Sequence, residues 1–261
     1  QGTTITSGSI STPAVPCATL DSLGVITIPL QDITKAQKLT LHTTLDGKYH
    51  NEWDIWAYPE VQETASGDFV YARTYNAEVK QALAQGKNVL LVPEQLKGRK
   101  TKFASHFWNP IMFNWNPKIV GTSIHHQHPV FRDFPTSYYA DWQWWDILNY
   151  AGAIDLTALT GLTPIIQSVD TYEVNRKLGI AFEAQVGKGK LFFLNLDLSK
   201  KMDERPATNQ LLRSISQYVR STDFQPSTTI PLYQLDALFA PDVTKGKQTQ
   251  GNAAIQQLLN Q

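Results

Sequence analysis

The sequence lacks most of the features that identify a protein's chemistry at once. It has one cysteine, Cys17, among 261 residues, so it can form neither an intrachain disulfide nor a cysteine-based metal site. No stretch approaches the roughly 18 consecutive apolar residues that a membrane span requires. The first residues contain no basic region followed by an apolar core, so we expect no signal peptide in this chain.

The chain also has no excess of either positive or negative charge. Lys and Arg total 23, Asp and Glu total 23, and the formal net charge is zero. A nucleic-acid-binding protein should carry a basic surplus, so we expect no nucleic acid among the partners, and the lack of a long apolar stretch predicts no membrane span. The G-x-S-x-G elbow, the G-x-G-x-x-G loop and the Walker pattern are absent as well. We therefore expect no nucleotide or other cofactor.

Apolar residues make up 42% of the chain, which is ordinary for a folded protein. Residues 1–60 have β character. Alternation predicts strands over residues 24–30, 38–45 and 49–58, and Asp46-Gly47 is a hairpin signal between the last two. Because a closed sandwich needs about seven strands, this segment is predicted to be a partial β-sandwich.

The pattern changes from residue 61 onward. A strand, an amphipathic helix and a continuous apolar strand follow one another, which is the sequence of a βαβ unit. We predict an open α/β sheet with an antiparallel edge over residues 61–225, followed by a C-terminal tail over residues 226–261. The expected strands are 69–72, 88–92, 164–169, 178–184 and 190–196, and the expected helices are 76–85 and 206–219.

Three tryptophans lie in the string DWQWWDIL, at Trp142, Trp144 and Trp145. On a helix Trp142 and Trp145 share a face, and Trp144 points elsewhere. A pyranose presents an apolar face and a ring of hydroxyls, so flat aromatic rings beside carboxylates and amides are typical of sugar sites. The polar candidates in this string are Asp141, Gln143 and Asp146. The alternative is that the indoles are core residues that wedge two domains together.

Two further groups of residues are candidates for a binding or catalytic site. Trp108 and Trp115 belong to an aromatic loop, and loops that follow strands in open sheets line the ligand crevice. His125, His126 and His128 are close in sequence and suit either metal binding or acid–base chemistry, but local backbone capping explains them equally well, and we predict no metal site. Carboxylates at Asp141, Asp146, Glu183 and Asp197 show no spacing that singles out a catalytic pair.

A series of motifs, in order, resembles the C-terminal region of the large family 2 glycoside hydrolases, which are β-galactosidase-like proteins with sugar-binding domains from glycan-degrading bacteria. The resemblance extends over about residues 23–225. Its motifs are NEWDIW (51–56), GKNVLL (86–91), FWN (107–109), HPVF (128–131), FPT (134–136), DWQWWD (141–146), NRKLG (175–179), FEA (182–184) and VGKGK (186–190).

This resemblance implies a flavodoxin-like or glutamine-amidotransferase-like α/β domain, preceded by part of a β-sandwich. It also implies a periplasmic or extracellular location. In that family the catalytic glutamates belong to an upstream barrel, so no catalytic residue is carried over to this chain. Amidotransferases use a cysteine nucleophile, and residues 61–225 contain no cysteine, so that activity is not implied.

The resulting hypothesis is a non-catalytic accessory region of a glycoside hydrolase, whose partner is a carbohydrate or a catalytic glycosidase domain. Sugar contacts are expected from the DWQWWD segment, with Trp108, Trp115 and His128 nearby. The alternative is a stand-alone glycoside or ester hydrolase that uses carboxylates or the loop from His125 to His128. A scaffold that binds no ligand is the third reading.

Overall fold

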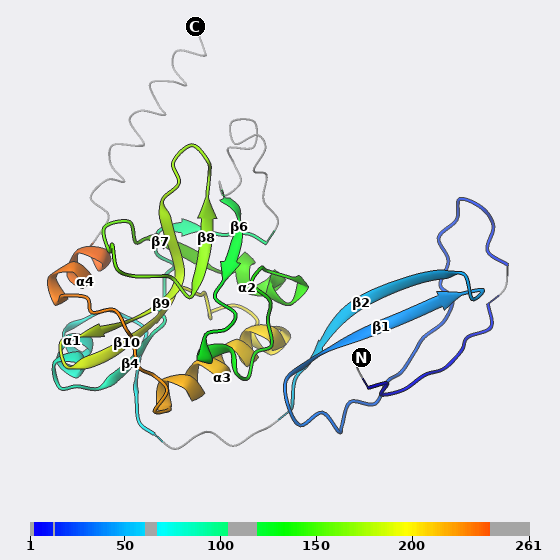
Figure 1. Ribbon diagram of the computed structural model, residues 1–261, viewed down its shortest axis with the longest axis horizontal. Helices are drawn as coiled ribbons and strands as arrows, with labels where there is room; N and C mark the ends of the chain where they lie inside the picture. Colours follow the sequence, from blue (N-terminus) through cyan, green and yellow to red (C-terminus); the bar gives the residue numbers. More distant parts are fainter. Residues whose placement is uncertain (1–2, 13, 61–66, 104–118, 241–261) are drawn as a thin grey trace, which may run out of the picture. The chain divides into compact units, whose positions relative to one another are not determined.

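The computed structural model describes residues 3–12, 14–60, 67–103 and 119–240. Contacts divide the chain into two compact units, residues 1–60 and residues 61–261 (Figure 1). We call them the hairpin unit and the α/β unit. The division falls where the sequence changes from β alternation to the βαβ pattern.

The hairpin unit contains the antiparallel strands β1 (Gln37–Leu45) and β2 (Tyr49–Ala57). Asp46 and Gly47 at the turn both have positive φ, 53° and 64°, as a type I′ turn requires. The predicted strand over residues 24–30 is wrong, because that segment has no regular secondary structure. Its β-branched residues satisfy local propensity, but no neighbouring strand pairs with them.

The two faces of this hairpin differ in chemistry. On one face Lys38 pairs with Asp54 at 3.1 Å and His42 lies 2.9 Å from Glu52. The other face carries cross-strand apolar pairs, and its Trp53 is 49% exposed. These pairs are Leu39 with Ile55, Leu41 with Trp53 and Leu45 with Tyr49. A two-stranded hairpin alone is marginally stable, so most of the chain's stability must come from the α/β unit.

The α/β unit is built on an open sheet of eight strands. Three neighbouring strands are parallel and the other described pairs are antiparallel, so the predicted mixed α/β class is confirmed. The antiparallel part is larger than the predicted edge, because five of the eight described strands pair only antiparallel. The strands run in the order β3 (Val70–Ala72), β4 (Asn88–Leu91), β10 (Gly189–Leu194), β9 (Lys177–Val186), β7 (Gly152–Asp155) and β5 (Arg99–Lys100), with β8 (Ile166–Asp170) beside β9 and β6 (Ile119–Ile124) beside β8.

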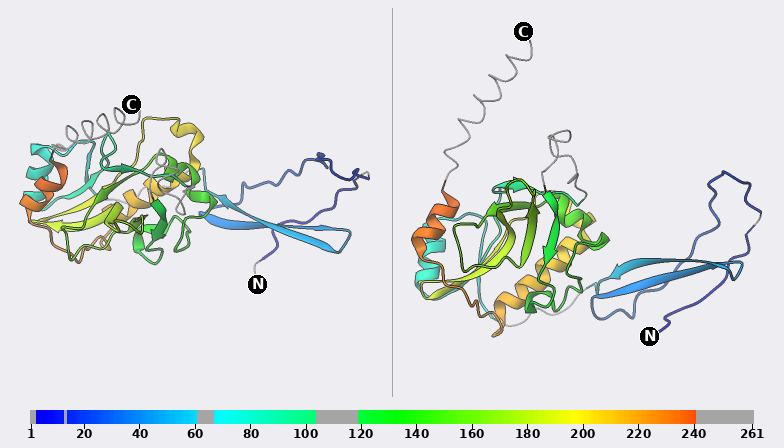
Figure 2. Two further views of the ribbon diagram at one scale, coloured as in Figure 1. Left: turned by 90° about the horizontal axis from the view of Figure 1, so that it is seen from above. Right: turned by 45° about the horizontal axis from the view of Figure 1, so that its top comes forward.

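Helices cover both faces of this sheet. One face packs against α1 (Ala77–Ala84) and α4 (Leu232–Phe239), which lie side by side in both views of Figure 2. The other face packs against α3 (Pro206–Arg220), where Phe192 of β10 lies 6.3 Å from Tyr218 between ring centroids. The remaining helical segments are η1 (Pro129–Phe131), η2 (Trp142–Trp144), α2 (Trp145–Asn149) and η3 (Met202–Glu204).

Local sequence explains where these helices begin and end. The Asn76 side chain accepts a hydrogen bond from the Val79 N–H and caps α1, and Gly86 follows its end with a φ of +85°. Pro206 occupies the first turn of α3, where its missing N–H costs nothing. The described part of the predicted tail packs on the core, since Leu235 of α4 is fully buried. Residues 241–261 lie outside the described residues.

Candidate functional site

The DWQWWD segment forms two short helical pieces instead of one continuous helix. The Asp141 carboxylate accepts a hydrogen bond from the Gln143 N–H at 3.2 Å and thereby caps η2. Gln143 is only 4% exposed, and its amide donates to the Pro135 carbonyl oxygen at 2.9 Å. Both polar side chains therefore hold the backbone of the segment in place.

Trp144 belongs to the core. It is fully buried between Phe131 and Phe134, at ring-centroid distances of 6.2 and 5.3 Å. Its indole N–H donates to the Thr136 hydroxyl at 2.8 Å, which satisfies the one polar atom of the ring. Trp144 is therefore not available to stack on a sugar, and its role is packing.

Trp142 and Trp145 are on the surface, with 71% and 52% of their area exposed. The Trp142 ring stacks on Phe103 at a centroid distance of 5.2 Å and an interplanar angle of 29°. We call Trp142, Trp145 and Phe103 the indole platform. Phe103 was not among the predicted site residues, because it lies 39 positions before Trp142 in a segment without periodicity. Both indoles therefore present apolar surface to solvent.

Asp146 has a structural partner. The Arg205 guanidinium donates to its carboxylate at 3.2 Å, and the Thr208 hydroxyl donates to the same oxygen at 2.6 Å. Arg205 is 3% exposed and also stacks over the Tyr150 ring at 4.4 Å. This buried ion pair joins α2 to α3, so Asp146 fixes the helix that carries Trp145. Trp108 and Trp115, also predicted to contact sugar, lie outside the described residues.

His128 acts on its own backbone and on the sheet. Its Nδ1 accepts a hydrogen bond from the Val130 N–H at 3.3 Å and caps η1. Its Nε2 lies 3.6 Å from the Glu183 carboxylate, and its ring contacts His125 and Tyr218. The hydrogen bond at Nδ1 agrees with the local-capping alternative for this residue, whereas Nε2 is within ion-pair distance of Glu183.

Glu183 and Tyr218 form the enclosed side of this cluster. Burial raises the pKa of Tyr218 well above its usual range, and the charge of Glu183 and a hydrogen bond to it act in the same direction. Within the described part of the chain, Glu183 Oε2 is buried and has no hydrogen-bond partner. His125 and His126 are exposed at the rim. The structure therefore brings His125 and His128 together, with ring centroids 5.7 Å apart, whereas His126 lies against Tyr138 at 6.3 Å.

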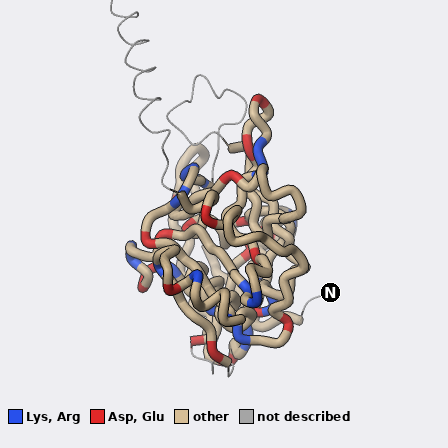
Figure 3. The backbone as a smooth tube through the Cα atoms, turned by 90° about the vertical axis from the view of Figure 1, so that its left-hand side faces the viewer, with Lys and Arg blue, Asp and Glu red and all other residues tan. Residues whose placement is uncertain are grey.

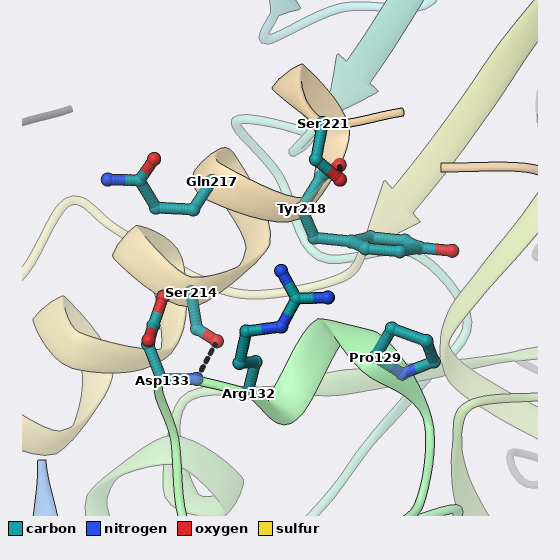
Figure 4. A pocket seen from close by; sticks show the side chains of 7 residues that line it. All are labelled: Pro129, Arg132, Asp133, Ser214, Gln217, Tyr218 and Ser221. Atoms are coloured by element: carbon teal, nitrogen blue, oxygen red, sulfur yellow. Dashed lines mark hydrogen bonds between the residues drawn. The ribbon is translucent and has the colours of Figure 1, made fainter. Parts of the chain in front are cut away.

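A cleft of about 160 Å³ lies between η1 and α3 (Figure 4). Arg132 extends into it from the end of η1 and forms an ion pair with Asp223. Ser214 closes its floor by accepting a hydrogen bond from the Asp133 N–H at 3.2 Å. The cleft is smaller than the 300–1,000 Å³ typical of ligand sites, and its one cation is already paired.

No group of three or more His, Cys, Asp or Glu side chains is placed to hold a metal ion in the ranges that the structure describes. None of the described helices is both long and apolar enough to span a membrane. Lys and Arg are interspersed with Asp and Glu in the view of Figure 3, in keeping with the zero net charge of the chain.

The strongest charge cluster is structural. The Asp170 side chain at the end of β8 is fully enclosed, and it accepts hydrogen bonds from Arg99 at 3.0 Å and from Arg176 at 2.7 Å. Burial alone raises the pKa of Asp170, but the hydrogen bonds from Arg176 outweigh it, so the pKa lies below its ordinary value. The cluster joins β5 to the turn between β8 and β9.

This cluster predicts a loss of stability in acid. Because the folded pKa of Asp170 is below the unfolded value of about 3.9, its contribution is complete above about pH 4 and disappears as the pH falls through the folded pKa. We expect urea unfolding at pH 7, 4 and 3 to show this loss, and Asp170→Asn to flatten it while lowering stability at pH 7. The exposed Asp203→Asn is the control. An unchanged acid profile in Asp170→Asn contradicts the assignment.

Two family models match the chain. The model described as Domain of unknown function (DUF8487) matches residues 70–240, and the model described as Domain of unknown function (DUF8488) matches residues 1–59. Their boundaries agree with the division into the α/β unit and the hairpin unit. No curated protein matches the chain.

Proposed function

The chain belongs to the DUF8487 family, and we propose that its α/β unit is a non-catalytic, carbohydrate-binding accessory domain of a glycoside hydrolase system. The observation that carries the proposal is the indole platform. Its two surface indoles, 71% and 52% exposed, follow each other on consecutive helical turns. A sugar that stacks on such rings removes its own apolar face and theirs from water.

Rigidity of the platform supports the same function. Trp142 stacks on Phe103, and Trp145 is carried by α2, which the Arg205–Asp146 ion pair joins to α3. The capping bond of Asp141 and the buried amide of Gln143 fix the backbone beneath the rings. A ligand therefore meets rings that are already positioned, and the entropic cost of ordering them on binding is small.

The hydrolase alternative has one observation in its favour, the contact between His128 and Glu183. We rank it second because Nδ1 of His128 accepts a backbone hydrogen bond, Nε2 faces the Glu183 carboxylate at 3.6 Å, and the adjacent cleft holds only about 160 Å³. A general base needs a free nitrogen within reach of a substrate proton. Turnover of nitrophenyl glycosides or esters that His128→Ala abolishes would reverse this ranking.

The finer expectations from the family 2 resemblance remain part of this proposal. The parallel strands β3, β4 and β10 support a flavodoxin-like or amidotransferase-like arrangement for that half of the sheet. The apolar face of the hairpin supports the proposal that the hairpin unit is part of a β-sandwich. In the same proposal, that sandwich lies beside a catalytic glycosidase domain. A periplasmic or extracellular location follows from the same proposal.

The platform is tested by substitution. We expect Trp142→Ala and Trp145→Ala each to weaken binding of a galactoside oligosaccharide at least about tenfold, or about 1.4 kcal/mol, because each removes a stacking surface. Calorimetric titration of the full chain measures the affinity, and thermal unfolding checks the fold. Tyr233→Ala on α4 is the matched control, because Tyr233 is 70% exposed. Binding that survives both tryptophan substitutions contradicts the platform.

A further inference from the structure

A second hollow, of about 260 Å³, lies at the carboxyl ends of the parallel strands. Ligands of open α/β sheets bind outside this edge. Arg73 directly follows β3, and Glu94 lies three residues after the end of β4. The Glu94 N–H donates to the Arg73 carbonyl oxygen at 2.9 Å. This bond holds the two loops side by side. We call the hollow the strand-end cleft.

The third parallel strand also contributes to the strand-end cleft. Asn195, which follows β10 and is fully buried, accepts a hydrogen bond from the Lys97 N–H at 3.1 Å and donates to the Lys97 carbonyl oxygen at 2.8 Å. These two bonds fix the backbone of Lys97 at the cleft. All three parallel strands therefore position residues that line it.

Two cations of the cleft lack a carboxylate partner among the described residues. The Arg73 guanidinium donates to the Tyr71 hydroxyl at 3.2 Å, and no described carboxylate forms an ion pair with Arg73 or Lys97. Glu94 is the one acidic residue in the lining and is exposed. The lining therefore carries one net positive charge, and an Arg side chain there suits a carboxylate or another planar anion.

The rest of the lining suits a sugar ring. Tyr75 and Phe239 lie 4.7 Å apart between centroids and form an aromatic wall. The Tyr75 hydroxyl donates to Asp236 at 2.6 Å, so the ring is held in place, and Asp236 is neutralised by Lys80 at 2.7 Å. The remaining polar groups of the lining, Thr74, Glu94 and Gln95, suit hydroxyl groups.

We infer that the strand-end cleft binds an acidic sugar residue, a uronic acid, with its carboxylate on Arg73 and Lys97 and its ring on the aromatic wall. At about 260 Å³ the strand-end cleft is also below the range of drug-sized ligand sites, so we assign it a single monosaccharide unit and not an oligosaccharide. The choice of a sugar rests on the proposed function, whereas the anion site rests on the cleft itself. The strand-end cleft and the indole platform share no residues, so a negative binding result at one does not decide the other.

The experiment follows backbone amide signals of the full chain by NMR during titration with glucuronate, galacturonate, glucose, galactose and acetate. We expect saturable shifts at residues 73–75 and 93–97 with both uronates. Arg73→Met or Lys97→Met should weaken uronate binding at least tenfold, and added salt should weaken it as well. Lys188→Met, an exposed lysine in the turn between β9 and β10, is the matched control.

Each other outcome has a definite meaning. No shift, or equal shifts with glucose and glucuronate, overturns the anion site. If acetate binds as tightly as the uronates, the carboxylate alone supplies the affinity, and the assignment of a sugar ligand is overturned. If the uronate shifts persist in Trp142→Ala and Trp145→Ala, they support a binding site in the strand-end cleft that is separate from the indole platform. If those substitutions abolish the uronate shifts, a separate site is overturned. Loss of neutral-glycan binding in these two variants concerns only the proposed function.

Discussion

Replacing Arg205 with Ala should lower the free energy of unfolding by about 3–5 kcal/mol, the largest effect that we expect from one polar side chain. Arg205 is 3% exposed and neutralises the Asp146 carboxylate, whose side chain is 17% exposed. It also donates to the Asp197 carbonyl oxygen at 2.8 Å. The substitution leaves the carboxylate enclosed without its cation, and removal of one partner costs more than the pair itself contributes.

Guanidinium-induced unfolding measures this effect. Lys201→Ala is the matched control, since the ion pair of Lys201 with Glu204 is 2.9 Å long but more than 60% exposed on both sides. We expect this control to change stability by less than about 1 kcal/mol. The double variant Asp146→Leu with Arg205→Met should be more stable than Arg205→Ala, because it removes both charges. Equal costs for Arg205→Ala and Lys201→Ala contradict a buried structural pair.

Trp144→Ala should cost about 3–5 kcal/mol of stability, because it opens a cavity between Phe131 and Phe134. It also leaves the Thr136 hydroxyl without its indole donor. Trp145→Ala, one residue along the chain, should cost less than about 1 kcal/mol, because about half of its surface is already in water. Urea unfolding of the two variants measures the contrast, and similar losses contradict the division between core and surface indoles.

Periodic segments were predictable from the sequence. Alternation and the Asp46-Gly47 turn predict the β1–β2 hairpin within a residue or two, and Pro206 marks the start of α3 correctly. These signals are local, since a turn or a helix start depends on a few consecutive residues. The strands β6 and β7 were not predicted, because short strands are stabilised by partners such as β8 and β9 that lie far along the chain.

The candidate site was predictable in part for the same reason. The spacing of Trp142 and Trp145 predicts a shared face, and both indoles are exposed. The spacing did not predict the role of Asp146, because its partner Arg205 lies 59 residues away. The strand-end cleft was not predicted at all. It depends on Arg73, Lys97 and Phe239, which only the sheet and α4 bring together.

The central claim is that the α/β unit holds carbohydrate on its surface without transforming it. Calorimetric titration of the purified chain with a panel of neutral and uronate-containing plant and host oligosaccharides, galactosides included, tests it most directly. The account predicts saturable heats with at least one class of glycan and no release of sugar over the same period. Absence of heat across the whole panel, or cleavage of the titrated glycan, would contradict it.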